Sequence, residues 1–287
     1  MTDAPRPCAG PLALSRRSLL IGLGGAVLSS CTNAPPAVTP SEVSVGQPVS
    51  YDARGLAIRG RYHPPQTGHP PRRIWVVIEG DGAAWHRGQP PTDPTPRRPV
   101  GPAVLEALPK DDARLWLARP CQFLPPGALA TCAPRYWTDG RFSGPVIAAY
   151  QALITQHAKG LPVILTGFSG GGVLTAELAL TRRDAAGLIT LAAPLDLEAW
   201  TRHHGVPPLA GPRPSAKMLR DLATLRIPTL YLFGARDTVV PPAMLPRTLA
   251  TLPTDRVRIV PGMRHSGDWA TLVGRNATAL LPQPSAL

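Results

Sequence analysis

The segment 167–171 constrains the fold of this chain more than any other. It reads Gly-Phe-Ser-Gly-Gly, a G-x-S-x-G pattern, and lies between the apolar run 161–166 and the helix-like stretch 173–181. A serine in a tight strand-to-helix turn adopts a strained backbone conformation that exposes its hydroxyl, and the flanking glycines remove Cβ atoms that would collide there. The chain has 27 glycines, so the pattern alone carries little weight. Its position between a strand and a helix makes Ser169 a candidate nucleophile.

Two later segments supply the partners that such a serine needs. A hydroxyl becomes an effective nucleophile when a histidine takes its proton and a carboxylate orients that histidine. Asp237 lies in the loop after the strand-like segment 227–233, and His265 follows the strand-like segment 256–260. Open α/β sheets place their sites at the carboxyl ends of strands, so we expect Ser169, Asp237 and His265 to meet at one edge of the sheet.

Simpler interpretations of these residues remain open. Asp237 is also a typical turn residue ahead of Pro241, and Asp196, which follows another strand-like segment, is the alternative acid. His203 and His204 resemble half of a metal site, but no cysteine or carboxylate at ligand spacing completes it. We therefore predict no metal and no cofactor.

The attack of a serine on a carbonyl also needs N–H donors for the oxyanion that forms. One donor is normally the amide after the nucleophile, here Gly170, and the second comes from the loop after the third strand. The segment 73–79 predicts that strand, and Asp81 follows it between two glycines that let the backbone approach a substrate closely. We expect the N–H of Asp81 to be the second donor. Its carboxylate would be unfavourable beside the developing charge unless it points away, so only the amide is assigned a role. The alternative is that Asp81 is only a turn residue.

At these positions the sequence resembles the α/β-hydrolases, and more narrowly the envelope α/β-hydrolases of proteobacteria. The resemblance extends over most of the chain from about residue 50 onward. It implies a serine hydrolase whose triad is Ser169, Asp237 and His265, in that order along the chain. One departure is Glu79, where many members of the superfamily carry histidine before the glycine. The segments that carry the resemblance are 78–82 with Trp85, 119–122, 136–137 with 141–143, 167–171, and the Asp237 and His265 loops.

The remaining segments predict a single α/β-hydrolase domain over residues 48–287. Strand-like and helix-like segments alternate after an opening hairpin, which indicates a mainly parallel, twisted sheet with helices on both faces. The interval 194–226, where α/β-hydrolases insert a lid, has few apolar runs, so we expect little or no cap domain. The hairpin strands are expected at 48–52 and 56–62, the other strands at 73–79, 114–117, 161–166, 188–192, 229–233 and 256–260, and the helices at 145–159, 173–181, 244–251 and 268–280.

Several side chains near these loops can either line a substrate pocket or simply pack, and we favour packing. They are Trp85, Trp200, His203, His204 and Leu209. We likewise expect Tyr136, Trp137 and Arg141 to pack beneath the site.

Residues 1–30 have the layout of an export signal rather than of a folded segment. Arg16 and Arg17 precede an apolar stretch at 19–28, and small residues lead up to Cys31. The stretch is shorter than the roughly 20 residues that a membrane-spanning helix needs. The arginine pair resembles a twin-arginine signal, with a Sec signal as the alternative.

The segment 28–31, Leu-Ser-Ser-Cys, resembles a bacterial lipobox, which would leave Cys31 as a lipidated first residue. Residues 31–47 then form a proline-rich tether between a membrane anchor and the domain. We expect a protein of the cell envelope that faces the periplasm, and Thr32 after the cysteine slightly favours the outer membrane. Ordinary signal cleavage with an incidental Cys31 is the alternative.

The cysteines also fit export. Cys8 would be removed with the signal and Cys31 lipidated, so Cys121 and Cys132 remain as one pair that suits an oxidising compartment. We predict a disulfide between them, with two buried free thiols as the alternative. Export by a twin-arginine route, in which folding usually precedes export, would require this bond to form late.

A formal net charge of +12 could attract nucleic acid or anionic lipid, but the basic residues are spread along the chain without aromatic interleaving. We therefore predict no nucleic-acid partner. The sequence as a whole indicates a serine hydrolase that cleaves a small-molecule acyl ester. Acyl transfer, peptide hydrolysis and a non-catalytic envelope protein that binds through the same fold are the alternatives. The sequence leaves the oligomeric state open.

Overall fold

The computed structural model of the protein describes residues 45–84, 89–211 and 213–277, all of which belong to one compact unit. The expected export signal, Cys31 and most of the tether lie outside the described residues, as do Trp85 and the end of the expected helix 268–280.

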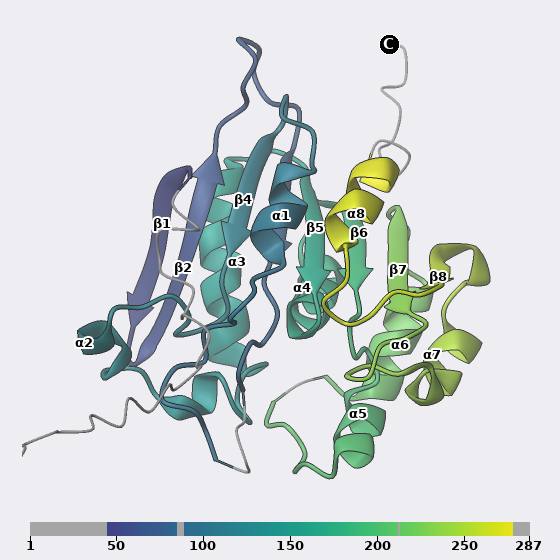
Figure 1. Ribbon diagram of the computed structural model, residues 1–287. Helices are drawn as coiled ribbons and strands as arrows, with labels where there is room; N and C mark the ends of the chain where they lie inside the picture. The colour runs from purple at the N-terminus through teal and green to yellow at the C-terminus, as the bar shows by residue number, and fades with distance from the viewer. Residues whose placement is uncertain (1–44, 85–88, 212, 278–287) are drawn as a thin grey trace, which may run out of the picture. The chain divides into compact units, whose positions relative to one another are not determined.

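Eight strands form one sheet in the order β1-β2-β4-β3-β5-β6-β7-β8 (Figure 1). β1 and β2 form the expected hairpin, β2 pairs antiparallel with β4, and all later neighbours pair in parallel. The central strands are continuous apolar runs, which is typical of parallel strands that are covered on both faces. Their bounds are β1 (Gln47–Ala53), β2 (Leu56–His63), β3 (Ile74–Ile78), β4 (Ala113–Leu117), β5 (Val163–Phe168), β6 (Ala185–Leu191), β7 (Thr229–Gly234) and β8 (Val257–Val260).

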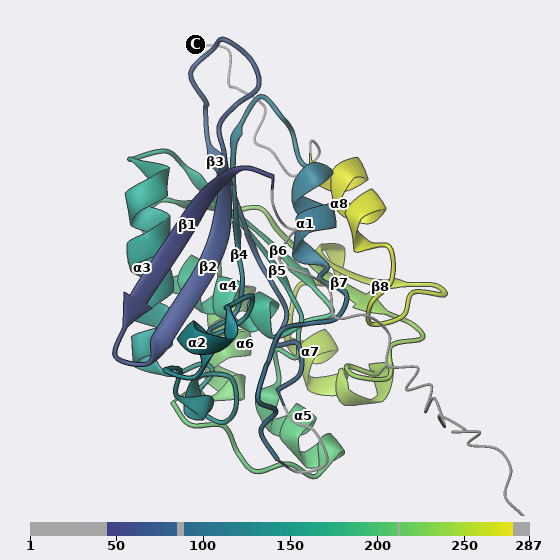
Figure 2. The same ribbon diagram turned by 60° about the vertical axis from the view of Figure 1, so that its left-hand side comes forward.

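Helices cover both faces of the sheet, as Figures 1 and 2 show. Alternate side chains of β3 point to opposite faces, so Val76 joins the core cluster formed with α3, α4 and α6, whereas Trp75 joins the cluster formed with α1 and α8. The bounds of these helices are α1 (Gly101–Glu106), α3 (Gly144–Ala158), α4 (Gly170–Thr181), α6 (Ser215–Ala223) and α8 (Trp269–Ala277). The predicted fold class is confirmed: a mainly parallel sheet with helices on both faces.

The interval in which a lid would be inserted contains two short helices, α5 (Leu197–His204) and α6. The helix α6 packs into the core against α4, so it is a crossover helix of the sheet rather than part of a cap. The remaining helices are α2 (Pro126–Leu129) and α7 (Pro246–Thr251), with 3-10 turns η2 (Pro134–Tyr136), η3 (Pro242–Met244) and η4 (Thr254–Arg256). Within the described ranges, no helix has the length and apolar character needed to cross a membrane.

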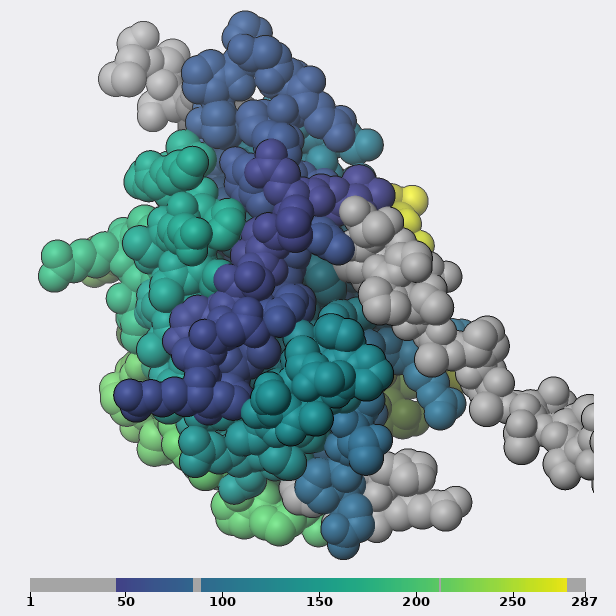
Figure 3. Space-filling view, turned by 90° about the vertical axis from the view of Figure 1, so that its left-hand side faces the viewer, coloured from purple at the N-terminus to yellow at the C-terminus, as the bar shows by residue number. Residues whose placement is uncertain are grey.

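The structure contains the expected disulfide between Cys121 and Cys132, which closes the loop that carries α2. Both sulfurs belong to a small apolar cluster with Ala57 of β2, Leu124 and Trp137. Figure 3 looks onto the hairpin of β1 and β2, drawn in purple, with the teal segment that carries α2 beside it. The bond therefore fixes this loop to the antiparallel edge of the sheet.

Loss of this bond should lower the free energy of unfolding by about 2–4 kcal/mol, because it removes a constraint on the unfolded chain. Denaturant unfolding with and without dithiothreitol measures the effect. A Cys132→Ala variant is the control, since its stability should already be lowered and should not respond to the reductant. Equal midpoints for oxidised and reduced wild-type protein would contradict the expectation.

Candidate active site

Ser169 occupies the turn between β5 and α4. Its backbone has φ 51° and ψ −123°, a conformation that few residues other than glycine adopt. Such a conformation costs on the order of 1–3 kcal/mol and persists only where the surroundings enforce it. Here the N–H of Ser169 donates to the carbonyl of Leu191 at 2.7 Å, which ties the turn to the end of β6. The strained backbone of Ser169 therefore lowers the stability of the fold and places its hydroxyl at the carboxyl edge of the sheet.

The glycines after Ser169 are required by close packing. A Cβ on Gly171 would collide with the carbonyl groups of Ile78 and Glu79 at the end of β3, and one on Gly170 would collide with the carboxylate of Asp81. The parallel pairing of β3 with β5 sets this approach, with Ile78 opposite Gly167. The serine turn and the loop after β3 are therefore in direct contact.

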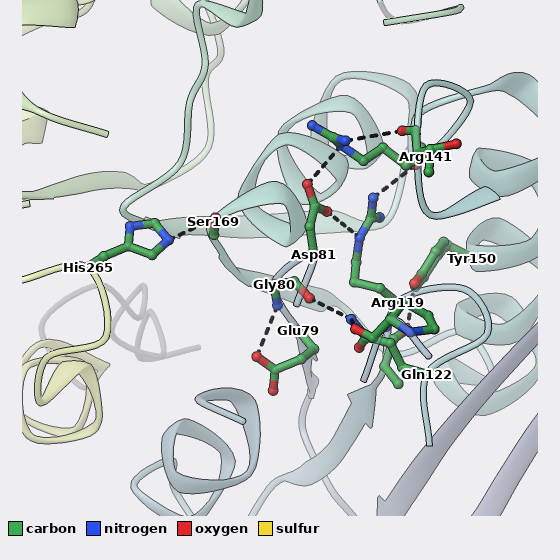
Figure 4. Close-up of polar contacts among 12 residues, drawn as sticks. Glu79, Gly80, Asp81, Arg119, Gln122, Arg141, Tyr150, Ser169 and His265 are labelled. Carbon is green, nitrogen blue, oxygen red and sulfur yellow. Dashed lines mark hydrogen bonds and ion pairs between the residues drawn. The ribbon is translucent and has the colours of Figure 1, made fainter. Parts of the chain in front are cut away.

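His265 lies within hydrogen-bond distance of the serine. Its Nε2 is 3.1 Å from Oγ of Ser169, and its Nδ1 is 2.8 Å from Oδ2 of Asp237 (Figure 4 shows the contact with Ser169). The carbonyl of His265 accepts a hydrogen bond from the indole of Trp269 at 2.7 Å, and its ring lies 5.0 Å from that of Phe168. The imidazole is therefore fixed by three contacts: Trp269 binds its backbone carbonyl, Phe168 packs near its ring, and Asp237 binds Nδ1.

Asp237 is buried and its carboxylate is fully paired. Oδ1 accepts the N–H groups of Val239 at 2.7 Å and Val240 at 2.8 Å, which leaves Oδ2 for His265. Burial alone would raise the pKa of Asp237, but the hydrogen bonds from His265, Val240 and Val239 together hold it below its ordinary value. The structure thus brings together the three predicted residues Ser169, His265 and Asp237.

The alternative acid, Asp196, has a different environment. Its Oδ1 caps the N-terminus of α5 by accepting the N–H of Ala199 at 3.0 Å, and its Oδ2 lies 3.2 Å from Nε of Arg247. It makes no contact with His265 among the described residues. Asp196 therefore acts as a helix cap.

The two amides predicted as oxyanion donors lie on adjoining elements. Gly170 begins α4, and Asp81 follows β3 in the loop that packs against the serine turn. Within the described ranges, neither N–H has a protein acceptor. Free amides beside a serine hydroxyl are the arrangement that an oxyanion site requires.

The side chain of Asp81 lies against Gly170 and between two arginines (Figure 4). Oδ1 accepts a hydrogen bond from Nε of Arg119 at 2.9 Å, and Oδ2 is 2.9 Å from Nε of Arg141. Sequence reasoning missed both ion pairs. Arg141 was expected only to pack beneath the site, Arg119 belonged only to the segments that carry the resemblance, and nothing in their spacing indicated a contact with Asp81.

Glu79, at the position where the sequence departs from the superfamily, is buried at the end of β3. Its Oε1 accepts the N–H groups of Gly80 and Val100, and its Oε2 accepts that of Gly101 at 2.7 Å. Burial raises the pKa of Glu79, and these three donors offset part of that rise. Glu79 thus ties the start of the Asp81 loop to the first amides of α1.

The side chains considered as pocket lining mainly pack. The indole of Trp200 and the imidazole of His204 both contact the carbonyl of Val239, at 3.0 and 2.8 Å, and so support the Asp237 loop from α5. Trp200 and Leu209 also contact the main core cluster. No group of three potential metal ligands occurs among the described residues.

Neither a protein-family model nor a curated protein matches the sequence. Solved structures do match. The esterase domain of a Rhodothermus marinus protein has 15% identity and a TM-score of 0.54, with 81% of this chain and 96% of that chain covered. Est1E from Butyrivibrio proteoclasticus, with ferulic acid bound, has 15% identity and a TM-score of 0.54, with 80% and 96% covered.

A third match is an α/β serine hydrolase without a lid from Xanthomonas campestris. It has 13% identity and a TM-score of 0.50, with 83% of this chain and 96% of that chain covered. The likeness to these structures, one of them described as an α/β serine hydrolase without a lid, shows that this chain has the α/β-hydrolase fold with little or no cap. At such identities the likeness concerns the fold, so the chemistry has to come from the residues of this chain.

Proposed function

We propose that this protein is a serine hydrolase that cleaves carboxylic esters. The observation that carries the proposal is the unbroken series Ser169 Oγ, His265 Nε2, His265 Nδ1 and Asp237 Oδ2, with separations of 3.1 and 2.8 Å across the two contacts. The strained serine backbone and the free amides of Gly170 and Asp81 complete the set of groups that ester hydrolysis needs. The bound ferulic acid of Est1E shows that a protein of this fold accommodates a carboxylic acid.

The geometry supports a two-step mechanism. In the first step Oγ of Ser169 attacks the ester carbonyl while Nε2 of His265 takes the hydroxyl proton, and the amides of Gly170 and Asp81 bind the oxyanion. His265 then returns the proton to the departing alcohol, which leaves an acyl group on Ser169. Water, activated by His265, hydrolyses that acyl-enzyme and regenerates the serine. Asp237 stays ionised and stabilises the imidazolium in both steps.

The same residues could transfer the acyl group to an acceptor other than water or cleave an amide, because the fold and the triad do not select between these reactions. Cleavage of an ester makes a smaller demand on them than cleavage of an amide, since an alkoxide is a better leaving group than the anion of an amine. A non-catalytic binding protein would not need the strain at Ser169 or its alignment with His265.

Labelling with a fluorophosphonate tests whether Ser169 is activated. The full-length protein in detergent should be labelled, and mass mapping of its peptides should place the adduct on Ser169 alone. Ser169→Ala should not be labelled. A folded wild-type protein that takes up no label would remove the hydrolase proposal and favour the binding protein.

We further propose that the protein is exported and anchored in the cell envelope through lipidated Cys31, as the envelope hydrolases that it resembles would be. The support is the lipobox-like segment 28–31, together with a Cys121–Cys132 disulfide that suits an oxidising compartment. Cys31→Ser should move the protein from the membrane fraction to the soluble fraction. Unchanged membrane association of this variant would contradict the anchor.

A further inference from the structure

The cluster of Asp81, Arg119 and Arg141 lies directly behind the proposed oxyanion site. The carboxylate of Asp81 contacts Gly170, whose N–H is one proposed donor, while its own backbone supplies the other. The side chain of Asp81 therefore packs between its own loop and Gly170. The groups that hold the carboxylate of Asp81 therefore also help to set the distance between the N–H groups of Asp81 and Gly170.

The two arginines are buried, which is a costly arrangement. The side chains of Arg119 and Arg141 are 2% and 3% exposed, and Nη1 of Arg119 has no hydrogen-bond partner among the described residues. Burying a cation is costly unless it is paired, and removing one partner of a buried ion pair leaves the other charge uncompensated. The carboxylate of Asp81 lies between the two guanidinium groups, and Asp139 is a further acidic neighbour of Arg141.

The arginines are themselves fixed by other contacts. Nη2 of Arg119 donates to the carbonyl of Arg141 at 2.9 Å, and both guanidinium groups lie over the ring of Phe142, at 5.1 and 5.6 Å. Arg141 also lies 5.4 Å from the ring of Trp200, whose indole binds the Asp237 loop. The cluster thus connects the loop of the proposed oxyanion donor with the loop of the proposed acid.

The turn that carries Arg119 contacts the Asp81 loop at a second point (Figure 4). Gln122, fully buried, donates from Nε2 to the carbonyl of Gly80 at 3.0 Å and accepts the N–H of Arg119 at its Oε1. Cys121 within this turn has φ 64°, a left-handed conformation that is unusual for a residue with a side chain, and its disulfide holds the turn in place.

We propose that Arg119 and Arg141 are positioning residues for catalysis: they hold and neutralise the carboxylate of Asp81 so that its backbone N–H and that of Gly170 form a working oxyanion site. This inference rests on the proposed hydrolase function. It explains how an acidic residue occupies a loop next to a developing negative charge. The arginines act through Asp81 and do not contact the substrate.

Steady-state hydrolysis of p-nitrophenyl acetate by Arg119→Gln and Arg141→Gln tests the proposal. Misplacing one oxyanion donor should lower kcat about 10- to 100-fold with KM changed less than about threefold, since the donor acts mainly in the transition state. The Ki of phenylboronic acid, which forms a tetrahedral adduct with the serine, should rise by a similar factor. Arg119→Lys keeps the charge and should recover part of kcat.

Arg182→Gln is the matched control. Arg182 is also a buried arginine, with its side chain 4% exposed and its Nη2 2.6 Å from Asp184, but it follows the far end of α4. Its loss should lower thermal stability without changing kcat or the Ki of phenylboronic acid. If Arg119→Gln and Arg182→Gln lose stability equally and both retain kcat, the arginines are only structural and the inference is wrong.

A double-mutant cycle decides whether Arg119 acts through Asp81. In an Asp81→Asn background there is no carboxylate to hold, so the loss of kcat from Arg119→Gln should shrink by at least about threefold, because contacting residues are energetically coupled. A loss of the same size in both backgrounds would show that Arg119 acts independently of Asp81 and would overturn the positioning role. Wild-type protein that neither hydrolyses esters nor takes a fluorophosphonate label would instead reject the proposed function, and this inference with it.

Discussion

Ser169→Ala should lower kcat for ester hydrolysis by about 10⁴- to 10⁶-fold, the loss typical of removing the nucleophile from a triad. The fold should be retained, because alanine keeps the Cβ and the N–H that binds the carbonyl of Leu191. His265→Ala should cause a similar loss, and the double variant should be no worse than either single one, since the triad acts as a unit. Initial rates with excess enzyme, alongside a thermal melt of each variant, measure these losses.

Ser266→Ala supplies the control for this result. Ser266 is exposed and directly follows His265, so it is the nearest serine in sequence to the proposed base. Its hydroxyl makes no hydrogen bond among the described residues, and its loss should leave kcat unchanged. Retained turnover in Ser169→Ala, or its loss in Ser266→Ala, would show that Ser169 is not the nucleophile.

The sheet and the meeting of the three candidate residues could be predicted because each depends on local patterns along the chain. Apolar runs predicted strands, and parallel strands bring their carboxyl ends to one edge, which is where Ser169, Asp237 and His265 lie. The boundaries were less accurate around the serine. The strand β5 extends through Phe168 and the helix α4 begins at Gly170, although a run of glycines disfavours a helix start. Close packing against the end of β3 requires those glycines, and this requirement outweighs their low helix propensity.

Features that depend on distant segments could not be predicted. The helix α1 has no side-chain cap from its own N-cap residue, and Glu79, directly after β3, accepts the N–H groups of Val100 and Gly101 instead. The contacts of Arg119 and Arg141 with Asp81 join three loops that only the folded sheet brings together. For the same reason, the sequence could not show that two arginines pair with the carboxylate of Asp81 beside Gly170.

Asp237→Asn should lower kcat by about 10⁴-fold while the protein remains folded, because an amide NH₂ facing Nδ1 of His265 favours the wrong imidazole tautomer. The asparagine oxygen can still accept the N–H groups of Val239 and Val240, so the loop should keep its conformation. Because the folded protein holds the pKa of Asp237 below its ordinary value, its carboxylate stabilises the fold above about pH 4, and this contribution is lost as pH falls further. The variant should therefore lose less stability than wild type on acidification below that pH.

Asp196→Asn provides a close comparison, since Asp196 is also a buried aspartate that follows a strand and accepts a backbone N–H. Asparagine caps helices about as well as aspartate, so the substitution should cost only its ion pair with Arg247, and kcat should change less than about threefold. The two substitutions remove the same charge from equally buried sites, and they differ in whether a histidine depends on that charge. A larger loss of kcat in Asp196→Asn than in Asp237→Asn would reassign the catalytic acid, whereas equal small losses would mean that His265 works without a carboxylate.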